Sequence, residues 1–102
     1  MSDTSYEKQG STLTVKPKGR LDLISSPVLE KELKEQMDSV QELIMDFTDV
    51  EYISSCGLRV LLAVEQELEK KEGSMKVIHA NDYIREVFEL VGFTDVVNVV
   101  QD

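Results

Sequence analysis

The chain has 102 residues, a length that fits one domain built around one hydrophobic core. Its 20 acidic residues against 11 Lys and Arg residues give a formal net charge of −9, which argues against binding to nucleic acid or to an anionic membrane surface. One cysteine excludes an internal disulfide and one histidine excludes a His-rich metal site, so we expect a cytoplasmic protein without a bound metal.

The chain begins with a predicted hairpin. Residues 12–16 alternate polar and apolar side chains, as in a strand that buries one face. Gly10 marks a turn that connects this strand to an earlier one near Tyr6. Pro17 has no N–H for a sheet hydrogen bond, so the second strand ends there or lies at a sheet edge.

A loop and a first helix follow the hairpin. Gly19 and Asp22 indicate the loop. Ser26 before Pro27 is typical of a helix start, because the serine oxygen can cap free N–H groups and proline fits the first turn. Apolar residues then recur every four positions, so we expect an amphipathic helix from about residue 27 to residue 38.

The apolar run from Leu43 to Phe47 lacks clean alternation, which is typical of a strand buried on both faces. Asp46 interrupts this run. Its carboxylate either points outward at the strand end toward N–H donors or belongs to an acidic cluster beside residues 54–57. The residue types alone leave both roles open.

The second predicted helix extends from Leu58 to Glu72, and Gly73 stops it. Its first half is apolar and its second half is charged, so we expect the first half to be buried. A short strand rich in apolar residues follows at 74–80.

The last predicted helix begins after Asn81, whose side chain caps it, and carries apolar residues at helical spacing between positions 84 and 91. Gly92 followed by Phe93 is typical of a helix end in which glycine turns left-handed and the next apolar residue folds back. Residues 95–100 form a last strand or a short apolar tail.

The order of these elements predicts the fold class. Strands that alternate with helices require crossover connections, and crossovers join parallel strands. Together with the N-terminal antiparallel hairpin, they predict an α/β fold with a mixed sheet of four to five strands, flanked by three to four helices. The sequence contains no linker or repeat, so residues 1–102 are expected to form one domain.

Residues 54–57, with the sequence SSCG, join a strand to the second helix. Such a corner presents backbone N–H groups and the positive end of the helix dipole, which favours an anion. One of Ser54 and Ser55 can cap the helix while the other offers its hydroxyl, and Gly57 permits the close approach of another surface.

These residue types leave four interpretations open. The segment is a capped helix start and nothing more, or one serine is phosphorylated and the added charge of about −1.5 to −2 changes docking more than folding. Alternatively, Cys56 is a reactive thiol made acidic by the helix start. Finally, Ser54 or Ser55 could be a hydrolase nucleophile, although the G-x-S-x-G motif is absent. Nucleotide-binding motifs are absent as well.

Three stretches resemble the STAS class of domains, and within it the small anti-sigma factor antagonists of bacteria. They are GRLD at 19–22, LIMDFTDVEYISSCGLRVLL at 43–62 and LVGF at 90–93. The middle stretch is the most specific, because it combines an apolar strand, a short turn, two small hydroxyl residues, Gly-Leu and an apolar helix.

The resemblance implies a phosphorylatable serine at the start of the second helix, which falls on Ser55. The family has Asp before this serine and a small residue after it, whereas this chain has Ser54 and Cys56. Asp22 matches an acidic position near the serine. The neighbours expected to contact a partner are Asp22, Ser54, Cys56, Gly57, Leu58 and Arg59.

The resemblance also implies partners. The unphosphorylated antagonist binds an anti-sigma factor that is a serine kinase, with ATP and magnesium bound on that partner, and so releases a sigma factor. A serine phosphatase restores the antagonist. The chain itself is then no enzyme and needs no cofactor. The alternative is a STAS scaffold or a transporter-associated regulatory module in which Ser55 is never phosphorylated.

Overall fold

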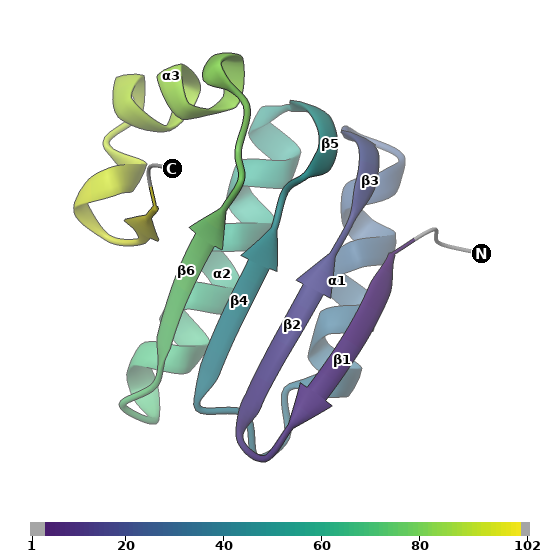
Figure 1. Ribbon diagram of the computed structural model, residues 1–102, viewed down its shortest axis with the longest axis vertical. Coiled ribbons are helices and arrows are strands. Elements are labelled where there is room, and N and C mark those ends of the chain that lie inside the picture. The colour runs from purple at the N-terminus through teal and green to yellow at the C-terminus, as the bar shows by residue number, and fades with distance from the viewer. Residues whose placement is uncertain (1–3, 101–102) are drawn as a thin grey trace.

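A five-stranded mixed sheet forms the centre of the structure, a computed structural model that describes residues 4–100 (Figure 1). The strand order is β1-β2-β4-β6-β7, in which β1 is antiparallel to β2 and every other pair is parallel. The strands are β1 (Ser5–Gln9), β2 (Thr12–Lys16), β4 (Glu42–Asp46), β6 (Ser74–Ile78) and β7 (Asn98–Val99).

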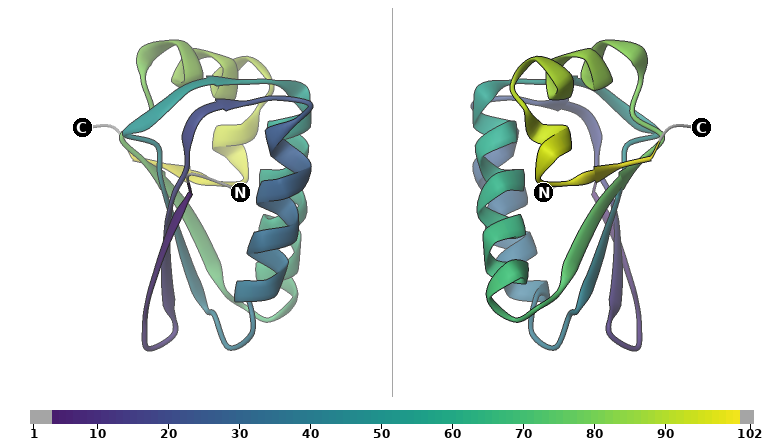
Figure 2. Two further views of the ribbon diagram at one scale, coloured as in Figure 1. Left: turned by 90° about the vertical axis from the view of Figure 1, so that its right-hand side faces the viewer. Right: turned by 90° about the vertical axis from the view of Figure 1, so that its left-hand side faces the viewer.

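Two further strands form a separate parallel pair, β3 (Lys18–Leu21) with β5 (Asp49–Ile53). Pro17 separates β3 from β2, since proline cannot continue the pattern of sheet hydrogen bonds. The pair bends away from the main sheet and passes over the ends of the helices (Figure 2). It therefore connects the sheet layer to the helix layer.

The helices α1 (Ser25–Gln36) and α2 (Ser55–Lys70) lie side by side on one face of the main sheet, and the described residues place no helix on the opposite face (Figure 2). Helix α3 (Asp82–Leu90) and a 3-10 turn, η1 (Phe93–Asp95), lie at one end of the sheet. The core fills the space between sheet and helices, and its largest fully buried side chains include Phe47, Phe88, Leu33 and Leu61. No helix within residues 4–100 has both the length and the apolar character needed to cross a membrane.

The predicted fold class is confirmed, and so are the signals around the last helix. Asn81 caps α3, because its Oδ1 accepts a hydrogen bond from the N–H of Ile84 at 2.8 Å. Gly92 has a φ of 75°, in the left-handed region that favours glycine. Phe93 folds back onto Phe88, with 4.5 Å between the ring centroids.

Two predictions about strands are wrong. Residues 18–21, predicted as part of a loop, form β3, because their backbone pairs with β5, a partner about 30 residues away that local sequence signals do not reveal. The apolar run at Leu43–Phe47 is not buried on both faces. Leu43 and Met45 are fully buried, whereas the alternate residue Ile44 is half-exposed on the face that no helix covers.

The prediction about the start of the first helix is also wrong. Helix α1 begins at Ser25, before Pro27, and no side chain caps it from the flanking position. Ser26 is instead buried inside the first turn, and its Oγ has no hydrogen-bond partner within the described residues. Helix α2 begins at Ser55, as the expected cap at Ser54 or Ser55 requires, one turn before the apolar stretch that starts at Leu58.

The burial of Ser26 reverses the effect expected of its replacement. A capping serine replaced by alanine costs about 1 kcal/mol of unfolding free energy, whereas removal of a buried, unpaired hydroxyl removes a desolvation cost. We therefore expect Ser26→Ala to leave the free energy of unfolding unchanged or to raise it by up to about 1 kcal/mol. Urea unfolding measures this, with Asn81→Ala as the control that should lose about 1 kcal/mol. A comparable loss in Ser26→Ala would contradict the structure.

Candidate functional site

The last residue of β3, Leu21, is hydrogen-bonded through its carbonyl oxygen to the residue that precedes α2. The register of the strand pair sets Leu21 opposite Ile53. The next residue, Ser54, donates two hydrogen bonds to the carbonyl oxygen of Leu21, from its backbone N–H at 2.9 Å and from its Oγ at 3.1 Å. The position of the helix start is therefore fixed relative to β3.

Ser54 also caps the helix. Its Oγ accepts a long hydrogen bond of 3.5 Å from the N–H of Gly57, and its carbonyl accepts one of 3.0 Å from the N–H of Leu58. The Ser54 hydroxyl thus acts as donor and acceptor at once. Of the two serines between which the sequence could not decide, Ser54 is the cap.

Ser55 is the first residue of α2, and its side chain is exposed. Its Oγ makes no hydrogen bond within residues 4–100. The N–H groups of the first helical turn have no carbonyl partner four residues earlier, and the helix dipole adds partial positive charge there. The free hydroxyl therefore lies at a point where added negative charge is tolerated.

Gly57 allows β3 and α2 to approach closely. A Cβ atom at this position would lie 2.8 Å from Cγ1 of Ile53 and 3.0 Å from the carbonyl oxygen of Leu21. Neither neighbour can move without disturbing the strand pair. The close approach that the sequence predicted for Gly57 is thus made by the chain itself, inside the site.

Asp22 follows β3 directly and shapes the loop before α1. Its Oδ1 accepts hydrogen bonds of 3.1 Å from the N–H groups of Ile24 and Ser25, and one of 3.2 Å from the Ser25 hydroxyl. The backbone hydrogen bond from Ser25 lowers the pKa of Asp22, with smaller contributions from the other bonds and from the nearby charge of Arg20. Since Leu21 pairs with Ile53 in a parallel register, Asp22 and Ser54 both follow the strand pair at its C-terminal end.

The remaining predicted site residues lie on the first two turns of α2. Cys56 and Leu58 are half-buried, and Arg59 is exposed. Ser55, Leu58 and Arg59 border a shallow hollow of about 430 Å³ between α2 and the segment that follows α3. Its other lining residues are Leu62, Val91, Gly92, Phe93 and Val96.

Exposed apolar side chains lie at the hollow that Ser55 borders and in the loop after β3, and sequence reasoning missed them. At the hollow, Val91 and Val96 are 58% and 52% exposed. In the loop after Asp22, Leu23 and Ile24 are 72% and 79% exposed. Such side chains are typical of docking surfaces when they gather around one point. The sequence signal was the pair Leu23–Ile24 within a predicted loop.

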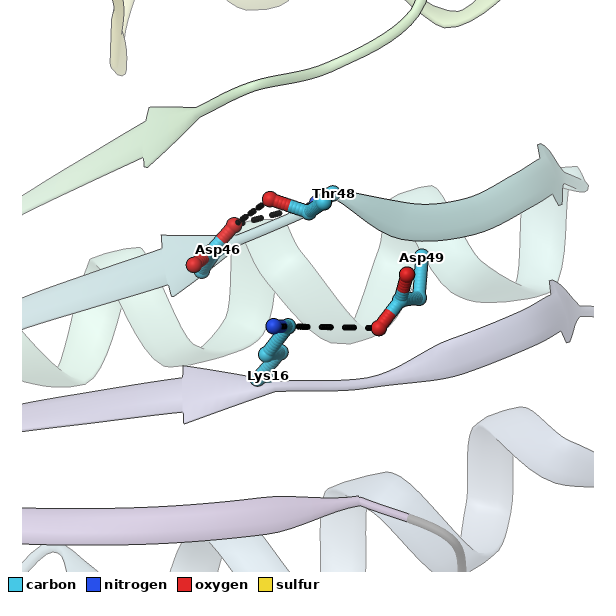
Figure 3. A network of polar contacts seen from close by, with 4 residues as sticks. All are labelled: Lys16, Asp46, Thr48 and Asp49. Atoms are coloured by element: carbon cyan, nitrogen blue, oxygen red, sulfur yellow. Dashed lines mark hydrogen bonds and ion pairs between the residues drawn. The ribbon is translucent and has the colours of Figure 1, made fainter.

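Asp46 lies at the end of β4, and its carboxylate accepts hydrogen bonds there, which is the first of the two roles that the sequence left open. Its Oδ1 accepts hydrogen bonds from the N–H of Thr48 at 3.0 Å and from the Thr48 hydroxyl at 2.6 Å. Burial raises the pKa of Asp46, but the two Thr48 hydrogen bonds, together with the electrostatic effects of His79 and Lys16, outweigh it, so the pKa is lowered overall. Lys16 lies beside this pair and forms an ion pair of 3.8 Å with Asp49 (Figure 3). Within residues 4–100, no group of His, Cys, Asp or Glu side chains could hold a metal ion.

The family model for the STAS domain matches residues 3–102, nearly the whole chain. The chain belongs to the STAS domain family. The match includes the strand pair and the capped start of α2, so the site described above lies within the matched domain.

Two curated relatives of this chain are anti-sigma factor antagonists by name. BtrV of Bordetella bronchiseptica is 38% identical over 69 residues, which cover 67% of this chain and 60% of that relative. Its name assigns it the antagonist role on a provisional basis. The anti-sigma-B factor antagonist of Bacillus subtilis is 27% identical over 81 residues, covering 79% of this chain and 74% of the relative.

The Bacillus protein SpoIIAA shares the fold. Its unphosphorylated structure superimposes with a TM-score of 0.78 at 18% identity, covering 97% of this chain and 88% of that chain. Its phosphorylated structure gives a TM-score of 0.76 at 19% identity, covering 97% and 92%. The fold of this chain therefore matches SpoIIAA in both forms. The family model shows membership of the STAS domain family, and the curated relatives named above are anti-sigma factor antagonists by name.

The close contact at Gly57 predicts that replacement by alanine destabilises the protein, although Gly→Ala in a helix is usually stabilising. Gly→Ala within a helix usually stabilises by up to about 1 kcal/mol. Here the added methyl would meet Ile53 and the carbonyl of Leu21, so we expect Gly57→Ala to lower the unfolding free energy by about 1–3 kcal/mol. Thermal and urea unfolding measure the change, with Cys56→Ala as the neighbouring control. A stabilised Gly57→Ala protein would contradict the close approach of β3 and α2.

The hydrogen bonds of Asp22 predict a pH dependence of stability. Because folding lowers the pKa of Asp22, its contribution is complete above the unfolded value of about 3.9 and is lost as the pH falls through the folded value. Asp22→Asn can accept the same hydrogen bonds but does not titrate. We therefore expect the Tm of the wild type to fall more steeply than that of Asp22→Asn below about pH 4. Parallel Tm curves for the two proteins would refute the assignment.

Proposed function

We propose that this chain is an anti-sigma factor antagonist whose docking is switched by phosphorylation of Ser55. The observation that carries the proposal is the division of roles between the two serines. The Ser54 hydroxyl is engaged with Leu21 and Gly57, whereas the Ser55 hydroxyl is exposed and unbonded within the described residues. Ser55 is therefore the serine that an approaching kinase can reach.

The proposed reaction is a phosphoryl transfer from a nucleoside triphosphate held by the partner. The Ser55 Oγ attacks the γ-phosphorus, the bond between that phosphorus and the β–γ bridging oxygen breaks, and the nucleoside diphosphate leaves with the bonding electrons. The hydroxyl proton passes to a base on the partner or to water. The nucleotide, its metal ion and the base all belong to the partner, so this chain is a substrate and no enzyme.

Phosphorylation should change the docking surface and leave the fold intact. The phosphate adds about −1.5 to −2 charge at the start of α2, where the helix dipole and the free N–H groups favour an anion. The exposed apolar side chains at the hollow that Ser55 borders, Val91 and Val96, would bury their surface only against a closely fitting partner. A desolvated phosphate in that interface is costly, so the anti-sigma factor dissociates.

The rest of the proposed cycle follows from the family. The unphosphorylated chain binds an anti-sigma factor that is itself the serine kinase and thereby frees a sigma factor, and a serine phosphatase reverses the modification. We infer that residues 1–102 act as one STAS domain in the cytoplasm. The net charge of −9 supports a protein partner rather than nucleic acid or a membrane.

Labelling by the cognate kinase tests the proposal. We expect the wild type and Ser54→Ala to incorporate phosphate and Ser55→Ala to incorporate none. Ser55→Asp should bind the anti-sigma factor at least tenfold more weakly than the wild type, as about 1.4 kcal/mol of lost affinity requires, with its Tm changed by a few degrees at most.

The two halves of this test can fail separately. Unchanged labelling of Ser55→Ala would exclude Ser55 as the acceptor. An unfolded Ser55→Asp protein would exclude a switch confined to the surface. If mass spectrometry of the native protein finds no phosphate under any growth condition, the alternative of a non-phosphorylated STAS scaffold replaces the proposal.

A further inference from the structure

We propose that Arg59 binds the phosphate of phosphorylated Ser55 within the same chain, so that the modified form carries a phosphoserine–arginine pair at the edge of the hollow. This inference rests on the proposed function, because it requires phosphate at Ser55. It assigns a role to Arg59, a residue that neither caps α2 nor belongs to the exposed apolar side chains described above.

The spacing of the two residues brings their side chains together. Ser55 and Arg59 are four residues apart on α2, and residues at this spacing lie on the same helix face about one turn apart. Side chains on a helix lean toward its N-terminus, so the long arginine side chain extends over the turn that begins at Ser55. Both residues border the same hollow, which places them on one side of the helix.

Arg59 is free to accept this role. Its side chain is exposed and makes no hydrogen bond or ion pair within residues 4–100. By contrast, Arg85 is paired with Asp82 at 2.6 Å, and Arg20 lies over the ring of Tyr52 at 4.2 Å from its centroid. A guanidinium group that has no partner among residues 4–100, four residues after a modifiable serine, is available for a phosphate.

The surroundings strengthen such a pair. Among the described residues that line the hollow, Arg59 is the one charged side chain, and the others are apolar except for Ser55 and Gly92. No carboxylate of the lining competes for the guanidinium. Beside an apolar surface a charge pair is screened less than in open water, and a guanidinium can donate two parallel hydrogen bonds to a phosphate.

The pair changes what a partner meets. In the unmodified chain, Arg59 is a cation with no ion pair to the described residues, on a protein of net charge −9 and at the same hollow as Ser55. After phosphorylation, the arginine is occupied by the phosphate and no longer available to a partner's acidic or carbonyl groups. One modification therefore alters two contact points on the same helix turn.

The experiment uses the full chain with phosphoserine inserted at position 55 during translation, so that no cognate kinase is needed. Phosphorus NMR titration gives the second pKa of the phosphate, which is about 6 without neighbours. We expect this pKa to be lower in the wild type than in Arg59→Gln by about 0.5 unit, because a nearby cation favours the doubly charged form. Arg59→Gln keeps most of the side-chain stem and replaces only the charge. Arg59→Lys, which cannot bind with two parallel bonds, should give an intermediate value.

Lys70→Gln provides the matched control, since it removes one positive charge from the other end of α2. The two ends are 15 residues and roughly 22 Å apart, well beyond the Debye length of about 8 Å. We expect its phosphate pKa to equal that of the wild type. An equal pKa in wild type and Arg59→Gln would overturn the pair, and an equal rise of the pKa in Arg59→Gln and Lys70→Gln would assign the effect to net charge alone. Either result leaves the labelling of Ser55 by a kinase as a separate question.

Discussion

The carbonyl oxygen of Leu21 is the contact on which the site depends. It receives the backbone N–H and the hydroxyl of Ser54, and it lies 3.0 Å from the point where a side chain on Gly57 would begin. The strand pair therefore fixes where α2 starts and which way its first residues face. Because Ser54 immediately precedes Ser55, this contact also fixes the position of Ser55 relative to β3.

The strand pair is held from its other side by α3. The ring of Tyr52 on β5 stacks on Tyr83 of α3 at 6.0 Å between centroids, and the guanidinium of Arg20 lies over the same ring. The amide of Asn81 donates hydrogen bonds to the carbonyls of Val50 and Glu51 at 3.3 and 3.4 Å. The frame around Ser55 is thus braced by three segments distant in sequence, and a charge added outside this frame need not disturb it.

The sequence predicted those helices and strands whose ends are set by residues close to them in the chain. Asn81 and Gly92 act within a few residues of their own positions, so the start and end of α3 follow from the sequence. The strand β3 depends on pairing with β5, and its glycine and following aspartate resemble a loop when read alone. Ser26 was misjudged because the loop before α1 is organised by Asp22, which already satisfies the N–H groups of Ile24 and Ser25.

At the candidate site, the sequence indicated the right segment but left the roles of its two serines open, and the geometry of Leu21 distinguishes them. The resemblance implies Asp at the position of Ser54, and the difference between the two side chains has a physical meaning. An ionised aspartate only accepts hydrogen bonds, so at this position it could cap Gly57 but would face the Leu21 carbonyl without a proton to donate. The serine hydroxyl does both. It also leaves the helix start without a fixed negative charge, so a phosphate on Ser55 would meet the helix dipole and Arg59 with no neighbouring carboxylate at residue 54 to repel it. Ser at position 54 therefore adds a hydrogen bond to β3 that an ionised Asp could not make, and it removes a fixed charge that would repel a phosphate on Ser55.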